Sequence, residues 1–142
     1  MGTVAKRGRR SSAPGDRAAP CPCGSGGPYA GCCGPLHRGE VDAATAEALM
    51  RSRFSAFAVG DAGYLLRSWH ERTRPARITL DPDRRWTRLE ILATDRGGLL
   101  DTVGAVEFRA HYRAAGRPGT LTERSRFVRA DGRWVYLDAE PG

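Results

Sequence analysis

All four cysteines of this 142-residue chain fall within thirteen consecutive positions, as Cys21, Cys23, Cys32 and Cys33. Four thiolates match the tetrahedral coordination that zinc prefers, and the glycines and prolines between the two pairs let so short a loop turn back on itself. Because four thiolates leave no coordination position for water, we expect a structural zinc ion that holds this segment folded. Residues 21–39 are therefore predicted to form a small zinc knuckle.

The alternatives to a metal site are two disulfides between the halves of the cluster, or four free thiols. Cys32 and Cys33 are adjacent, so a bond between them would be strained, and disulfide frameworks normally spread their cysteines along the chain. His37 lies four residues after Cys33 and could replace a cysteine as ligand. Since four thiolates already complete the shell, we place His37 beside the site. The clustering favours metal and a reducing, cytoplasmic compartment.

The formal charge of +7 is concentrated at the N-terminus. Residues 1–20 contribute five bases minus one acid, or +4, and their composition of Gly, Ser, Pro, Arg and Ala is typical of disorder. Such a basic tail can attract nucleic acid weakly through counterion release. The chain has no run of about 18 apolar residues, so we expect no membrane insertion.

Helices are predicted after the knuckle. Thr45 is a plausible N-cap, with Glu47 in the first turn, where the helix dipole favours an acid. Apolar residues then recur at helical spacing, at Met50, Phe54, Phe57 and Ala58. Gly60 ends this helix, and Asp61 caps a second short helix that runs through Trp69.

The chain after Pro75 has the pattern of strands, at residues 86–94, 103–114 and 120–129. The second of these alternates apolar and polar side chains with a period of two, and Gly116–Gly119 is predicted to be the turn that follows it. The strongest hairpin signal is Asp131-Gly132, which would pair Val128 with Val135 and Phe127 with Tyr136. Helices followed by antiparallel strands define an α+β fold. For residues 40–140 we prefer a cone in which a bent sheet wraps the first helix, and a homodimer could form through the other sheet face.

Glu123 is the most suggestive residue outside the knuckle, because the alternation points it into the cone. A carboxylate there needs a partner or a raised pKa. We favour a structural ion pair with Arg51 or Arg53 over a catalytic Glu123 with His70 as its proton carrier. His70 is also explained by the favourable dipole at a helix C-terminus. The residues expected to form a pocket or the ion pair are Arg51, Arg53, Tyr64, Trp69, Glu123 and Ser125.

Two resemblances add to this reading. The segments Cys21–Gly26, Tyr29 and Cys32–Gly34 resemble the SEC-C motif, a zinc knuckle that docks on chaperone and ribosome surfaces in the SecA translocase. SEC-C knuckles carry several lysines between their cysteine pairs, whereas this chain has glycine, proline and alanine there.

A longer set of segments is similar to the YchJ family of uncharacterised bacterial proteins (UPF0225). These segments are Leu49–Phe57, Tyr64–Leu65, Trp69–His70, Glu123–Phe127 and Gly132–Trp134. The resemblance implies an N-terminal SEC-C knuckle on a domain like nuclear transport factor 2 (NTF2-like). Many members carry a second knuckle at the C-terminus; this chain ends at Gly142 without one, so we expect no bivalent use of the knuckle.

Three functional hypotheses follow, in this order. The first is an interaction or adaptor protein whose knuckle contacts a protein partner. The second is a small-molecule-binding protein or enzyme that uses the cone, with Glu123 and His70 as candidates; no catalytic constellation is established. The third is nucleic-acid association through residues 1–20.

Overall fold

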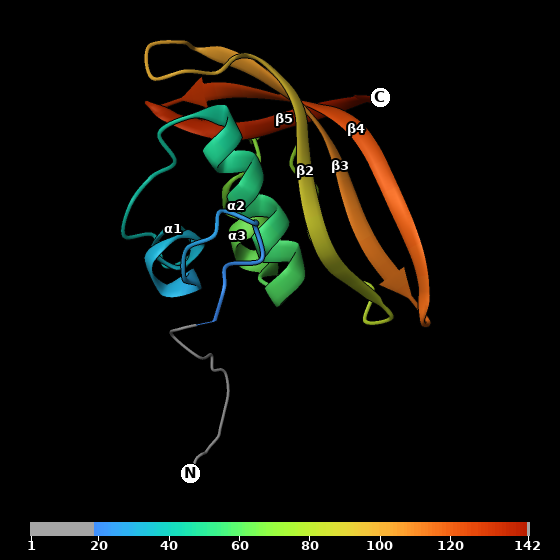
Figure 1. Ribbon diagram of the computed structural model, residues 1–142. Helices are drawn as coiled ribbons and strands as arrows, with labels where there is room; N and C mark the ends of the chain where they lie inside the picture. The colour runs from blue at the N-terminus through green and yellow to red at the C-terminus, as the bar shows by residue number, and fades with distance from the viewer. Residues whose placement is uncertain (1–18, 142) are drawn as a thin grey trace.

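The computed structural model of this chain describes residues 19–141 (Figure 1). The predictions of a disordered tail and of nucleic-acid binding concern basic residues before position 19, which lie outside the described residues. Within 19–141, no helix is long and apolar enough to span a bilayer.

The two predicted helices form, and their caps are the expected ones. Helix α2 spans Ala46–Val59; the Thr45 Oγ1 accepts a hydrogen bond from the Ala48 amide at 3.1 Å, and Gly60 ends the helix with a left-handed φ of 81°. Helix α3 spans Ala62–Arg67 and begins where Asp61 Oδ1 accepts from the Tyr64 amide at 3.0 Å. It is shorter than predicted and ends before Trp69.

Four antiparallel strands follow in the order β2-β3-β4-β5, so the α+β prediction is confirmed. Their bounds are Arg84–Arg96, Val103–Ala114, Arg117–Ala130 and Arg133–Pro141. The last hairpin has the predicted register, with Val128 opposite Val135 and Phe127 opposite Tyr136.

The turn between β3 and β4 lies earlier than predicted. Ala114 pairs directly with Arg117, so the turn consists of Ala115 and Gly116, both with positive φ. Pro118, expected within the turn, is a strand residue opposite Arg113. The β4–β5 pairing begins only at Glu123. The missing N–H of Pro118 therefore interrupts no ladder with β5.

The sheet curves around α2, which lies on its concave side (Figure 1). The core joins apolar residues of α2 to the concave faces of all four strands; its buried members are Ala46, Leu49, Met50, Phe54, Leu89, Val106, Phe108, Ala110, Phe127 and Trp134. Helix α2 is also buried on its other side, at Ser52 and Ser55, each 0% exposed. The predicted apolar stripe therefore accounts for only one of the two buried sides of this helix.

The opposite, convex face of the sheet carries charged side chains joined in ion pairs. Arg126 and Asp138 approach to 2.6 Å across β4 and β5. On β2 and β3, Glu90 contacts His111 at 2.7 Å and Arg109 at 3.5 Å. The predicted homodimer would use this face, and it stays a prediction.

Candidate metal centre and pocket

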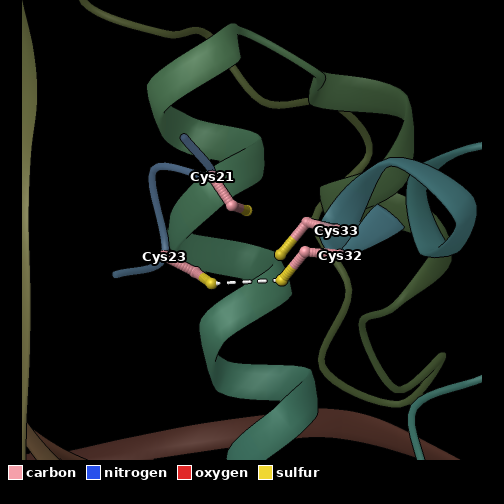
Figure 2. Close-up of side chains that lie close together, drawn as sticks. All are labelled: Cys21, Cys23, Cys32 and Cys33. Atoms are coloured by element: carbon pink, nitrogen blue, oxygen red, sulfur yellow. Dashed lines mark hydrogen bonds between the residues drawn. The ribbon is translucent and has the colours of Figure 1, made fainter. Parts of the chain in front are cut away.

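The first cysteine pair lies on a tight loop beside α2 (Figure 2). The Cys21 amide donates to the Gly27 carbonyl at 2.9 Å, and the Gly24 amide donates to the Cys21 carbonyl at 3.1 Å. Gly24 and Gly26 have φ values of 80° and 91°, in the left-handed region that glycine tolerates. These turns direct the side chains of Cys21 and Cys23 to the same side of the loop (Figure 2).

The second pair is placed by the short 3-10 helix η1 (Tyr29–Gly31) and helix α1 (Cys33–His37). The Cys32 amide donates to the Tyr29 carbonyl at 3.1 Å. Gly34 allows this close packing, because a Cβ there would lie 2.8 Å from the Tyr29 carbonyl oxygen.

The four sulfur atoms converge, all within 4.8 Å of one another, with 3.5 Å between Cys23 and Cys32 (Figure 2). A tetrahedral shell with zinc–sulfur bonds of about 2.3 Å has sulfur–sulfur edges of about 3.8 Å. The observed spacing fits such an ion, and Cys21, Cys23 and Cys33 are buried while Cys32 is half-buried. All four are free thiols. The cluster can hold a metal ion.

The thiols influence one another strongly. Hydrogen bonding with Cys21 and Cys33 lowers the pKa of the Cys23 thiol, whereas hydrogen bonding with Cys21 and Cys23, together with burial, raises the pKa of Cys33. One thiolate therefore forms easily, and its negative charge opposes the deprotonation of the next thiol. A bound dication would offset this repulsion and allow further deprotonation.

Helix α2 anchors the knuckle through polar contacts on one of its sides. Arg51 Nη1 donates to the Cys23 carbonyl at 2.8 Å, while its Nε donates to Glu47 at 3.0 Å. The Ser55 hydroxyl lies 3.8 Å from Cys21 Sγ.

His37 connects the same parts of the molecule. It is 6% exposed, and both of its ring nitrogens are occupied: Nδ1 lies 2.7 Å from the Tyr29 hydroxyl, and Nε2 lies 2.8 Å from the Ser52 carbonyl. Burial lowers the pKa of His37, so the neutral ring is favoured. The ring also packs against Tyr64, with 4.7 Å between the centroids. His37 thus stands outside the sulfur cluster and joins the knuckle to α2 and α3.

A pocket of about 150 Å³ lies between the other side of α2 and the concave sheet. Its lining is mainly aromatic and apolar: Met50, Arg53, Phe54 and Phe57 from α2, then Trp69, Trp86, Phe108, Ala110, Leu121, Glu123, Ser125 and Tyr136. Burial alone raises the pKa of Glu123.

The expected ion pair of Glu123 with Arg51 or Arg53 does not form. Arg51 faces the knuckle, and the Arg53 Nη1 donates to the Leu65 carbonyl at 2.8 Å and to the Ser68 hydroxyl at 2.7 Å. Within residues 19–141, no salt bridge or side-chain hydrogen bond involves Glu123.

The predicted site residues separate into two groups. Arg53, Trp69, Glu123 and Ser125 line the pocket, whereas Tyr64 contacts His37 and Ser52 on the knuckle side, like Arg51. His70 does not line the pocket; its amide donates to the Tyr136 carbonyl at 2.7 Å and its Nδ1 accepts from the Arg72 amide at 3.0 Å.

The aromatic walls Phe57 and Trp86 were not predicted as pocket residues, because a sequence gives no sign of which core aromatics border an empty volume. Tyr136, by contrast, could be placed from the sequence. The hairpin register places it on the same face as Phe127, and that register was available from Asp131-Gly132.

A four-cysteine knuckle, followed by a curved antiparallel sheet with a helix packed on its concave side, is the arrangement of a SEC-C motif joined to an NTF2-like domain. Residues 17–35 match the SEC-C motif, and residues 45–139 match the family described as YchJ, middle NTF2-like domain. The chain belongs to this family, whose members are called UPF0225 proteins, as the resemblance predicted.

Relatives and solved structures agree with this assignment. A UPF0225 protein of Streptomyces coelicolor is 60% identical over 121 residues, which cover 85% of this chain and 94% of the relative. One of Deinococcus radiodurans is 50% identical over 121 residues, covering 84% and 88%.

Two SEC-C motif containing proteins of known structure share the fold. The solution structure from Rhodopseudomonas palustris has a TM-score of 0.76 and 35% identity, covering 86% of this chain and 98% of that one. The crystal structure from Psychrobacter arcticus has a TM-score of 0.72 and 26% identity, covering 86% and 82%.

Proposed function

We propose that the metal of the knuckle is zinc and that its role is structural. Four sulfur ligands suit zinc, fill its tetrahedral shell and leave no position for a substrate. The contacts of Arg51 and His37 with the knuckle support this role, because they join the metal-holding segment to α2. Free clustered thiols also suit a reducing cytoplasm.

We propose further that the protein acts through its cone pocket, as a small-molecule-binding protein. The supporting observation is that three polar groups of the pocket have no hydrogen-bond partner among the described residues. Within residues 19–141, no hydrogen bond is made by the Glu123 carboxylate or by the Ser125 and Tyr136 hydroxyls, although all three border a mostly apolar pocket. Ser125 is buried, whereas Glu123 and Tyr136 are half-buried. Buried polar groups are normally paired, and polar groups left open in a pocket can bind a ligand.

A rim variant with a matched control tests this function. Leu121 borders the pocket and is 37% exposed, so Leu121→Trp should narrow the mouth without disturbing the core. Leu100→Trp is the control, because Leu100 is 97% exposed in the loop between β2 and β3. Small fragments screened by amide chemical shifts should perturb the lining in the wild type and in Leu100→Trp, but not in Leu121→Trp. No fragment binding to the lining of the wild type would refute the function.

A second candidate is an adaptor that binds a protein partner. The observation in its favour is the loop between β2 and β3, where Leu99 and Leu100 are 69% and 97% exposed. The knuckle itself offers little charge for docking, since residues 19–36 contain no charged side chain. A partner lost on replacing all four cysteines by serine would locate binding at the knuckle; one lost only in Leu99→Ser would locate it at the loop.

A further inference from the structure

Arg53 is a buried cation that has no counter-charge in the described part of the chain. It is 5% exposed, and within residues 19–141 no carboxylate lies within salt-bridge distance of its guanidinium. Its Nη1 holds the Leu65 carbonyl and the Ser68 hydroxyl, at 2.8 and 2.7 Å. The Nε and Nη2 groups have no acceptor among the described residues.

Aromatic rings stabilise this guanidinium only in part. Its carbon lies 4.5 Å from the ring centroid of Tyr136 and 5.2 Å from that of Trp69. Such cation–π contacts reduce the penalty of burial without replacing an anion. Burial accordingly lowers the pKa of Arg53 to about 10. A ligand anion that reached the guanidinium would be strongly favoured, because the desolvation of Arg53 has already taken place on folding.

The size and walls of the pocket define the body of the ligand. Phe54, Phe57 and Trp86 border it, and its volume is about 150 Å³. A cavity of that order holds a single benzene-sized ring. Polymers, lipid chains and nucleotides are too large to be enclosed.

Glu123 limits the charge of the ligand. Its carboxylate borders the same pocket, and no cation of the described residues lies within salt-bridge distance of it. A dianion such as phosphate would be repelled by it more strongly than a monoanion.

We propose that the pocket binds a small aromatic monocarboxylate, with the carboxylate on the guanidinium of Arg53 and the ring against the aromatic wall. This inference rests on the proposed small-molecule-binding function and adds the ligand class. Glu123 acts as a specificity residue that disfavours more highly charged anions.

Three probes with the same ring and similar size test the ligand class on the full chain at pH 7: benzoate, which is an anion, benzylamine, which is a cation, and benzyl alcohol, which is neutral. Calorimetry or amide chemical shifts should give benzoate a dissociation constant on the order of 1 mM or lower. We expect it to bind at least tenfold more tightly than either of the other two. Arg53→Lys keeps the charge but loses the planar fork, so benzoate affinity should fall about tenfold.

Because Arg53 is buried and its replacement could unfold the protein, a second variant keeps the test decisive. Glu123→Gln removes a nearby negative charge, so it should strengthen benzoate binding severalfold, while Glu107→Gln on the convex face should leave it unchanged. Benzylamine or benzyl alcohol binding as tightly as benzoate would overturn the ligand class; the pocket function would still stand if Leu121→Trp abolished that binding. No binding of any probe, or weaker benzoate binding by Glu123→Gln, would also overturn the class.

Discussion

The polar groups along the two long sides of α2 differ in how fully they are paired. On the side facing the knuckle, Arg51, Ser52 and Ser55 all contact polar partners. On the side facing the sheet, Arg53 lacks a counter-ion and Glu123 lacks any partner among the described residues. Satisfied groups stabilise a fold, whereas open groups in a cavity are available to a ligand. The knuckle side of α2 therefore has the contacts of a structural region, and the pocket side is where we propose that a ligand binds.

The largest expected effect comes from breaking the knuckle. Cys33→Ser removes one of the four sulfur ligands at a residue that is 2% exposed, so zinc content should fall from one ion per chain to near zero. With zinc at a thousandfold above its dissociation constant, the free energy of unfolding should fall by about 4 kcal/mol. Metal analysis and chemical denaturation measure both. Ser25→Ala, in the exposed loop beside Cys32, is the control and should retain zinc. Unchanged stability in Cys33→Ser would show that the knuckle does not hold α2.

A smaller effect is expected from acid, through His37. Burial lowers the pKa of His37 in the folded protein, while the unfolded chain takes up a proton near pH 6.5. Below that pH the unfolded state binds more protons, so stability should decrease from about pH 7 to pH 5.5, by at most about 1.4 kcal/mol per pH unit. Denaturation with zinc in excess measures this slope, and His37→Gln should flatten it. An equal slope in His37→Gln would place the titrating group elsewhere.

Local signals in the sequence were sufficient for much of this architecture. Thr45 and Asp61 cap helices because their side-chain oxygens accept from nearby amides, and Asp131-Gly132 sets the register of the last hairpin. The four cysteines were sufficient for the cluster. The turn at Ala115 was misplaced because Pro118 was expected outside a strand. Pro118 fits in β4 because β5 does not pair with β4 there, and the extent of that pairing is not a local property of the sequence.

The pocket was less predictable, because it depends on how α2 is covered on two sides. Arg51 and Arg53 are two residues apart and therefore about 200° apart around the helix. From the sequence alone, either arginine could reach Glu123. In the structure, Arg51 faces the knuckle instead. The sequence identified Glu123 but not its lack of a partner in the described part of the chain, since an absent contact depends on every neighbouring element.

Two tyrosines allow the two sides of α2 to be compared through the contribution of a single hydroxyl group to stability. The Tyr64 hydroxyl lies 2.7 Å from the Ser52 hydroxyl on the knuckle side, and both residues are buried. Tyr64→Phe should therefore lower the free energy of unfolding by about 1 kcal/mol. Tyr136→Phe, on the pocket side, removes a hydroxyl without a partner among residues 19–141 and should change stability by less than about 0.5 kcal/mol.

Urea denaturation of the two variants gives the difference directly, because each loses one oxygen from the same residue type. Equal losses would mean that the Tyr136 hydroxyl is satisfied in the folded protein, which would remove part of the case for an open pocket. No loss in Tyr64→Phe would mean that the Ser52 contact contributes nothing to stability. A loss of stability in Tyr64→Phe but not in Tyr136→Phe agrees with polar groups that are paired on the knuckle side of α2 and open to a ligand on the pocket side.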